Sequence, residues 1–238
     1  MNRVEVQPDS DSLATAVAGE LLSRLVGIQT AGQIPSICLT GGTIADAIHR
    51  ELARLTPSSE VDWSRVDIWW GDERYVEATS PERNVLQART ALLDHVPVDP
   101  ARVHEMPASS AGDLVAAAAA YGAEVREHGS GQFDIMMLGV GPDGHVASLF
   151  PGFPQLDVTD AITVAVTDSP KPPPERVSLT FEALNRSRSV WFLVSGDGKA
   201  AAVAAALGGA DLHEIPATGV SGSEETIWFL DHAAASQL

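Results

Sequence analysis

Short apolar runs alternate along the chain with longer segments in which apolar residues recur at helical spacing. Each run is too short for a buried helix and is typical of a strand covered on both faces. The predicted strands span residues 35–39, 66–70, 134–138, 162–166, 189–194 and 226–230. The predicted helices span residues 10–29, 44–55, 84–93, 111–128 and 197–207. This alternation predicts an α/β fold with a doubly wound, mostly parallel sheet and helices on both faces.

The length of the chain suits one domain. At 238 residues and 25.0 kDa, a domain buries about 70–75% of its unfolded surface, so we expect a single domain over residues 1–238. The first residues, MNRVEVQPDSDS, are charged and polar and lack the apolar segment of a secretory signal. No run approaches the roughly 18 apolar residues of a membrane span. We therefore expect a soluble, cytoplasmic protein.

Charge and cysteine content narrow the possible partners. The formal net charge of −17 argues against nucleic acid or an anionic membrane, because both require clustered cations. A small anion needs only a local positive pocket. The single cysteine, Cys38, lies in an apolar run, which indicates a buried structural thiol and neither a disulfide framework nor a cysteine metal site.

The most informative stretch is Phe133–Gly152, FDIMMLGVGPDGHVASLFPG, where a predicted strand ends at glycines. Ligands of open α/β sheets bind outside the carboxyl ends of the strands, so Asp143 and His145 are candidates for chemistry. We further expect His145 to open a short helix, whose positive end favours a neutral imidazole. The structural alternative is that His145 only caps a tight turn.

Residues 139–144 also fit G-x-G-x-x-G, the dinucleotide fingerprint. That fingerprint requires a long helix directly after it and an acidic residue about 20 positions on, at the end of a second strand. Residues 151–154, PGFP, would end any helix after about one turn, and Asp157 and Asp160 precede the next apolar run instead of closing it. We therefore expect no nicotinamide or flavin cofactor.

Three other strand ends carry complementary groups. Residues 40–43, TGGT, open a helix and can bind a phosphate through free backbone N–H groups and the helix dipole, although a merely tight glycine turn is an equal alternative. Residues 71–74, GDER, place Asp72 and Arg74 after a buried strand, unless they form an ordinary solvated loop. Residues 171–176, KPPPER, hold two cations on a stiff proline segment, or form a rigid connector. Residues 196–199, GDGK, are interpreted as a helix cap, since the full phosphate-loop motif is absent there.

Together these groups predict a pocket for a phosphorylated small molecule with one histidine placed to move a proton. The sequence contains no G-x-S-x-G elbow, no candidate catalytic cysteine and no histidine spacing typical of a metal site. Direct attack by a base-activated water, without a metal, is the remaining chemistry.

The motifs resemble those of the 6-phosphogluconolactonases and occur in the same order along the whole chain. They are residues 40–43, 70–74, 138–152 and 171–176. The resemblance implies hydrolysis of 6-phospho-glucono-1,5-lactone to 6-phosphogluconate in the pentose phosphate pathway, without a metal or cofactor. It implies a catalytic group of His145 as base with Asp143 and Asp72. The implied phosphate and sugar ligands are Gly41, Gly42, Thr43, Arg74, Lys171 and Arg176.

One departure and two alternatives accompany this resemblance. Family members often show Ser-Asn where this chain has Arg83-Asn84, which puts a hydroxyl contact there in doubt. The related glucosamine-6-phosphate deaminases and isomerases continue D-G-H-I-A-F-N-E-P with a ring-opening glutamate, whereas residues 148–151, SLFP, supply no acid. A non-catalytic sugar-phosphate sensor would not need His145, but such regulators commonly carry a basic DNA-binding segment that this chain lacks.

Overall fold

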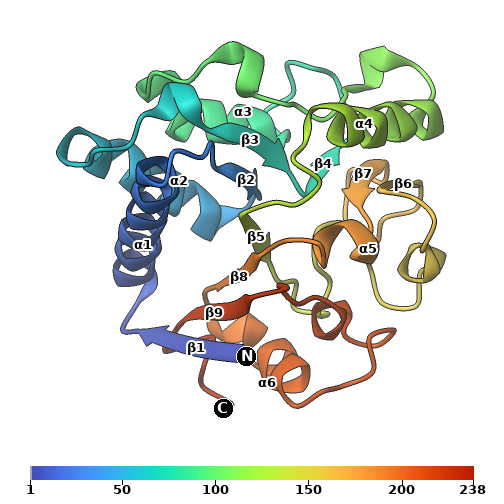
Figure 1. Ribbon diagram of the computed structural model, residues 1–238. Helices are drawn as coiled ribbons and strands as arrows, with labels where there is room; N and C mark the ends of the chain where they lie inside the picture. The colour runs from blue at the N-terminus through green and yellow to red at the C-terminus, as the bar shows by residue number, and fades with distance from the viewer. Residues whose placement is uncertain (1) are drawn as a thin grey trace.

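The structure, a computed structural model, describes residues 2–238 and is built around a six-stranded sheet. The strand order is β1-β9-β8-β5-β2-β3, and all neighbouring strands run parallel (Figure 1). The strands are β1 (Asn2–Gln7), β2 (Ser36–Leu39), β3 (Asp67–Trp70), β5 (Ile135–Gly139), β8 (Ser189–Val194) and β9 (Glu225–Asp231). The predicted α/β fold with a mostly parallel sheet is confirmed.

Helices cover the sheet, with α1 and α2 packed together on one side and α5 and α6 on the other (Figure 1). The helices are α1 (Ser10–Thr30), α2 (Thr43–Leu55), α3 (Asn84–Ala91), α4 (Leu114–His128), α5 (Phe181–Leu184) and α6 (Ala200–Leu207). Short 3-10 turns span Thr56–Ser58, Trp63–Arg65, Leu93–His95, Pro100–Arg102, Ser109–Ala111, Pro154–Asp157, Asp197–Lys199 and Pro216–Gly219. Aspartates cap the longest helices: Asp9 accepts from the Ser12 N–H, and Asp113 accepts from the Ala116 N–H.

A second, three-stranded antiparallel sheet was not predicted. Its order is β4 (Asp72–Arg74), β7 (Arg176–Leu179), β6 (Thr163–Val166). The predicted strand at residues 162–166 therefore belongs to this small sheet. Its register places Asp72 opposite Ser178 and Arg74 opposite Arg176. Two charged segments distant in sequence are thereby brought side by side.

The chain reverses its winding direction at β2, which places the site. From β2 the chain passes to β3 on one side, and it later returns through β5 on the other. The loops after β2 and β5 consequently leave the sheet in opposite directions and leave a crevice between them, where open α/β sheets bind ligands. Residues 40–42, after β2, and residues 140–145, after β5, belong to those two loops.

The single cysteine is buried, as its place in an apolar run predicted. Cys38 is fully buried and free, and burial raises the pKa of its thiol well above the ordinary value. In the part of the chain that the structure describes, no helix is both long and apolar enough to cross a membrane.

Candidate active site

A cavity of about 660 Å³ opens at the carboxyl ends of the central strands, at the crevice beside β2. It gathers eight of the residues proposed from the sequence. They are Gly41, Gly42, Thr43, Asp72, Arg74, His145, Lys171 and Arg176. The ninth, Asp143, lies directly behind His145, so the proposed groups are neighbours in space.

His145 and Asp143 form a tightly bonded pair. His145 Nδ1 lies 2.5 Å from Asp143 Oδ1. Burial alone would raise the pKa of Asp143, but the hydrogen bond from His145 and the positive charges of His145 and Lys171 outweigh it and lower that pKa to about 2. The ionised carboxylate can only accept, so Nδ1 carries the hydrogen, and Nε2 is the ring nitrogen on which a proton can be gained or lost. The ring also packs against Phe150, with centroids 4.7 Å apart.

The loop that carries this pair depends on Gly141. A Cβ at Gly141 would lie 2.0 Å from His145 Nδ1 and 2.3 Å from Asp143 Oδ1, so a larger residue there would displace both side chains. The expected short helix at His145 is wrong: residues 145–150 form a turn closed by the Val146–Leu149 bridge. A helix dipole therefore does not act on His145, and Asp143 sets its tautomer instead.

Arg74 is fixed by a buried network at the start of α3. Its Nη1 donates to Asn84 Oδ1 (2.6 Å) and to the Glu82 carbonyl (2.7 Å). Glu73 is fully buried and accepts from the backbone N–H groups of Arg74, Asn84 and Val85. These contacts hold Arg74 at the rim of the cavity before any ligand arrives.

Arg83 and Asn84 stand where family members often have Ser-Asn, and the structure shows what each of them contacts. Asn84 lines the cavity, and Gly41 leaves room for it, since a Cβ at Gly41 would lie 1.9 Å from Asn84 Oδ1. Arg83 is 3% exposed, donates to the Met106 carbonyl and lies 3.7 Å from Glu73. Arg83 is thus buried beneath the site and is not among the residues that line the cavity.

Lys171 and Arg176 occupy different positions in the site. Lys171 Nζ lies 3.4 Å from His145 Nδ1 and 3.9 Å from Asp143 Oδ1, beside the basic histidine. Arg176 donates from Nε to the Pro173 carbonyl and from Nη2 to the Lys171 carbonyl. Burial lowers the pKa of Arg176, although Asp72 opposes the shift. Arg176 therefore holds the proline segment in place and contributes its positive charge to the lining of the cavity.

Lys199 is a site residue that the sequence interpretation missed. It lines the cavity and donates to the Val140 carbonyl (2.7 Å), which links the 3-10 turn Asp197–Lys199 to the His145 loop. Burial, with a smaller effect of Lys171, lowers the pKa of Lys199. The available signal was its rarity: the chain has two lysines, and both line this cavity.

The glycine turn forms the anion side of the cavity. Gly42 is the N-cap residue of α2 and Thr43 its first residue, and both line the cavity. The positive end of α2 thus faces the same space as Arg74, Lys171, Arg176 and Lys199. In a chain of net charge −17, this is a local concentration of positive charge suited to a phosphate.

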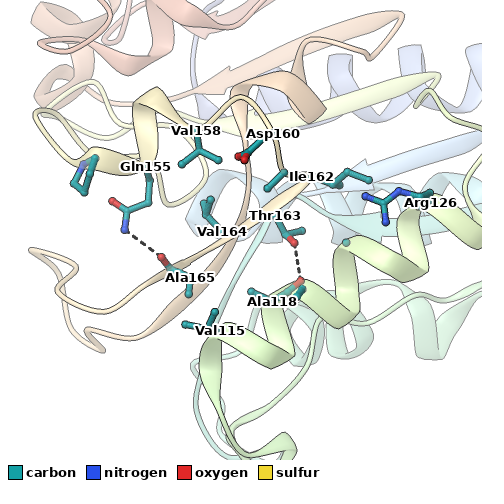
Figure 2. A pocket seen from close by; sticks show the side chains of 14 residues that line it. Val115, Ala118, Arg126, Gln155, Val158, Asp160, Ile162, Thr163, Val164 and Ala165 are labelled. Carbon is teal, nitrogen blue, oxygen red and sulfur yellow. Dashed lines mark hydrogen bonds between the residues drawn. The ribbon is translucent and has the colours of Figure 1, made fainter.

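A second cavity, of about 510 Å³, lies between α4 and β6 (Figure 2). Thr163 Oγ1 donates to the Ala118 carbonyl (2.6 Å) across it, and Gln155 Nε2 donates to the Ala165 carbonyl (3.1 Å). Its lining is mainly small and apolar, and it includes none of the residues proposed for the site. The chemistry therefore belongs to the cavity at the strand ends.

Comparison with known proteins agrees with this geometry. Residues 8–228 match the family model described as glucosamine-6-phosphate isomerases/6-phosphogluconolactonase. The chain is 46% identical over 243 residues to a 6-phosphogluconolactonase of Streptomyces coelicolor, covering 98% of this chain and 93% of the relative. It is 46% identical over 244 residues to a 6-phosphogluconolactonase of Mycobacterium tuberculosis, covering 99% and 98%.

Solved structures give the same result. A crystal structure of 6-phosphogluconolactonase from Thermotoga maritima superposes with a TM-score of 0.86 at 27% identity, covering 97% of this chain and all of that one. A monomeric glucosamine-6-phosphate deaminase superposes with a TM-score of 0.84 at 22% identity, which shows the shared fold alone. The chain therefore belongs to the glucosamine-6-phosphate isomerase/6-phosphogluconolactonase family.

Proposed function

We propose that this chain hydrolyses 6-phospho-D-glucono-1,5-lactone to 6-phospho-D-gluconate, the lactone step of the oxidative pentose phosphate pathway. The observation that carries the proposal is one cavity that combines a histidine oriented by a carboxylate with both lysines of an acidic chain. The names of the relatives that match over nearly the full chain support the same reaction.

In the proposed mechanism His145 is the general base. Its Nε2 removes a proton from a water molecule as the water oxygen attacks the lactone carbonyl carbon, while Asp143 stabilises the imidazolium through Nδ1. The carbonyl oxygen becomes an oxyanion, which the positive charge of Lys171 beside the histidine can stabilise. Collapse re-forms the carbonyl and breaks its bond to the ring oxygen. The ring oxygen then receives the proton held on Nε2, which restores the base.

The phosphate is assigned to the positive side of the same cavity. The N-terminus of α2 at Gly42 and Thr43 offers backbone N–H groups, and Arg74 and Lys199 line the same space. The cavity of about 660 Å³ lies in the usual range of roughly 300–1,000 Å³ for small-molecule sites. Such a division leaves Asp72 free to accept hydrogen bonds from the hydroxyl groups of the sugar.

One contact favours the lactonase over a deaminase. In the deaminase pattern D-G-H-I-A-F-N-E-P, the glutamate falls at the position of Phe150, whose ring packs on His145 with centroids 4.7 Å apart. Phe150 is 1% exposed and carries no acid that could assist ring opening. We therefore expect no deamination of glucosamine 6-phosphate.

The test is lactone hydrolysis by the purified protein, measured against a buffer blank because the lactone also opens unaided. The phosphorylated and unphosphorylated lactones are compared in one series, with glucosamine 6-phosphate as a third substrate. We expect efficient hydrolysis of the phosphorylated lactone only. Equal efficiency on both lactones would refute the phosphate pocket, and ammonia release from glucosamine 6-phosphate would favour the deaminase.

A further inference from the structure

Asp72 presents one carboxylate to the cavity while the rest of the residue is held by the protein. The residue is 7% exposed, its backbone carbonyl accepts from Asn84 Nδ2 (2.9 Å), and it pairs with Ser178 between β4 and β7. Its Oδ2 accepts a hydrogen bond from Ser148 Oγ at 2.6 Å. An ionised carboxylate offers about four acceptor positions, so this bond leaves positions that can face a ligand.

The backbone and the hydroxyl of Ser148 are held by separate hydrogen bonds. Ser178 Oγ accepts from the Ser148 backbone N–H (3.2 Å) and donates to the Leu179 carbonyl (3.0 Å). Ser148 itself is 1% exposed, and its hydroxyl donates to Asp72. Ser178 thus holds the backbone of the His145 loop at Ser148, while the Ser148 hydroxyl makes its own bond to the carboxylate.

The backbone is bent to make this contact. Ala147 has a φ of +48°, the one positive φ among the non-glycine residues described by the structure, and such a conformation is unfavourable for a residue with a Cβ. The bend lies in the turn that the Leu149 N–H closes on the Val146 carbonyl (2.9 Å). It separates His145, at the cavity, from Ser148, which points to Asp72 from the buried side. Strain that persists at a ligand site is commonly part of its organisation.

We propose that Ser148 is a positioning residue that fixes the Asp72 carboxylate, so that Asp72 accepts hydrogen bonds from the hydroxyl groups of the lactone while His145 acts on its carbonyl. This inference rests on the proposed function. The turn of residues 145–150 then orients both working groups, His145 directly and Asp72 through the Ser148 hydroxyl. A carboxylate without this bond can rotate away from the substrate, at a cost in transition-state binding.

The test is a double-mutant cycle of Ser148→Ala and Asp72→Ala, with kcat and KM for the phosphorylated lactone measured above the spontaneous rate. A hydrogen bond to a charged group contributes enough that Ser148→Ala should lower kcat/KM about tenfold in the wild-type background. In the Asp72→Ala background the same change should have no further effect, because the carboxylate that Ser148 positions is gone. Ser148→Ala should also change kcat and KM in the same directions as Asp72→Ala.

Ser187→Ala is the matched control, because Ser187 is also fully buried and its hydroxyl has no partner among residues 2–238. It should keep wild-type kcat/KM, and circular dichroism should show that all variants are folded. Normal activity of Ser148→Ala, or an equal loss with and without Asp72, would overturn the positioning role while wild-type turnover still supports the lactonase. Wild-type activity in Asp72→Ala would overturn the role of Asp72 and that of Ser148 with it. An inactive wild-type protein would overturn the proposed function itself.

Discussion

The Asp143 carboxylate fixes the tautomer of His145 and leaves Nε2 as the basic nitrogen. Replacing His145 should therefore remove the general base. Positioned general bases contribute about 10²–10⁴-fold, so His145→Ala should lower kcat by that factor and leave KM comparatively unchanged. The measurement is steady-state hydrolysis of the phosphorylated lactone with the buffer rate subtracted.

The structural alternative for His145 makes the opposite prediction. If the ring only supports the turn through Asp143 and Phe150, His145→Ala should lose thermal stability and keep its turnover per folded molecule. His145→Gln, which is closer in size, separates packing from chemistry. A folded variant with near wild-type kcat would rule out the proposed base.

The two lysines should affect substrate binding differently. Charge-assisted contacts are worth about 1.5–3 kcal/mol, so Lys199→Ala should raise KM for the phosphorylated lactone by about 10- to 150-fold. Lys171 lies 3.4 Å from His145 Nδ1, so Lys171→Ala should lower kcat as well. Arg126→Ala, an exposed cation at the second cavity, is the control and should change neither constant. If kcat fell for Lys199→Ala and not for Lys171→Ala, Lys199 and not Lys171 would be the lysine that acts in catalysis.

Individual site residues could be predicted from the sequence where a chemically reactive side chain directly follows a predicted strand. Asp143 and His145 follow a buried strand and Gly141, where a larger residue would displace both side chains. The structure places the two side chains in contact. Lys199 was interpreted as part of a helix cap. Its place in the cavity depends on its contact with the Val140 carbonyl, and that contact exists only in the folded chain. Ser148 could not be identified, since its partner Asp72 is distant in sequence and belongs to a strand that was not predicted.

Helix α2 contains a buried histidine that should make stability depend on pH. His49 is 2% exposed, and burial lowers its pKa from 6.5 to about 4, with Asp46 opposing the shift slightly. The ring is neutral in the folded protein, whereas the unfolded chain binds a proton below about pH 6.5. His49 therefore leaves the free energy of unfolding undiminished above about pH 6.5. That free energy falls as the pH decreases from 6.5 toward 4, because the unfolded chain then binds the proton. The loss should be about 3 kcal/mol.

Urea unfolding of the wild type and of His49→Gln between pH 7 and pH 4 measures this contribution. Carboxylates titrate in both proteins, so the difference between the two curves isolates His49. We expect the wild type to lose more stability than the variant over this range. Parallel curves would show that His49 keeps an ordinary pKa in the folded state.

The elements that the sequence predicted are those with a strong hydrophobic period. The central strands are buried on both faces and read as apolar runs, whereas β1 is an edge strand in which Val4 and Val6 are each about 40% exposed. Strand β4 consists of Asp, Glu and Arg, and its strand geometry arises from pairing with β7. Propensity does not reveal such strands, because tertiary pairing determines them.

For the molecule as a whole, the proposed chemistry requires only its own side chains. His145 activates the water and four cations balance the charge of the substrate, and residues 2–238 contain no cluster of three or more His, Cys, Asp or Glu arranged to hold a metal. Exhaustive dialysis against EDTA should therefore leave kcat and KM unchanged. Activity that falls on dialysis and returns with zinc or magnesium would contradict a metal-independent reaction.

The parallel pairing of β1 with β9 determines the order in which the sheet can be completed during synthesis. Asn2 lies opposite Thr226 and Gln7 opposite Asp231, so the first strand of this sheet in chain order pairs with the last. At roughly 5–20 residues per second, the nascent chain carries an unpaired first strand for about 10–50 s. The strands that frame the cavity, β2, β3 and β5, emerge well before that. This edge of the sheet can therefore close only after the strands that frame the cavity have been made, and β1 lacks its partner until then.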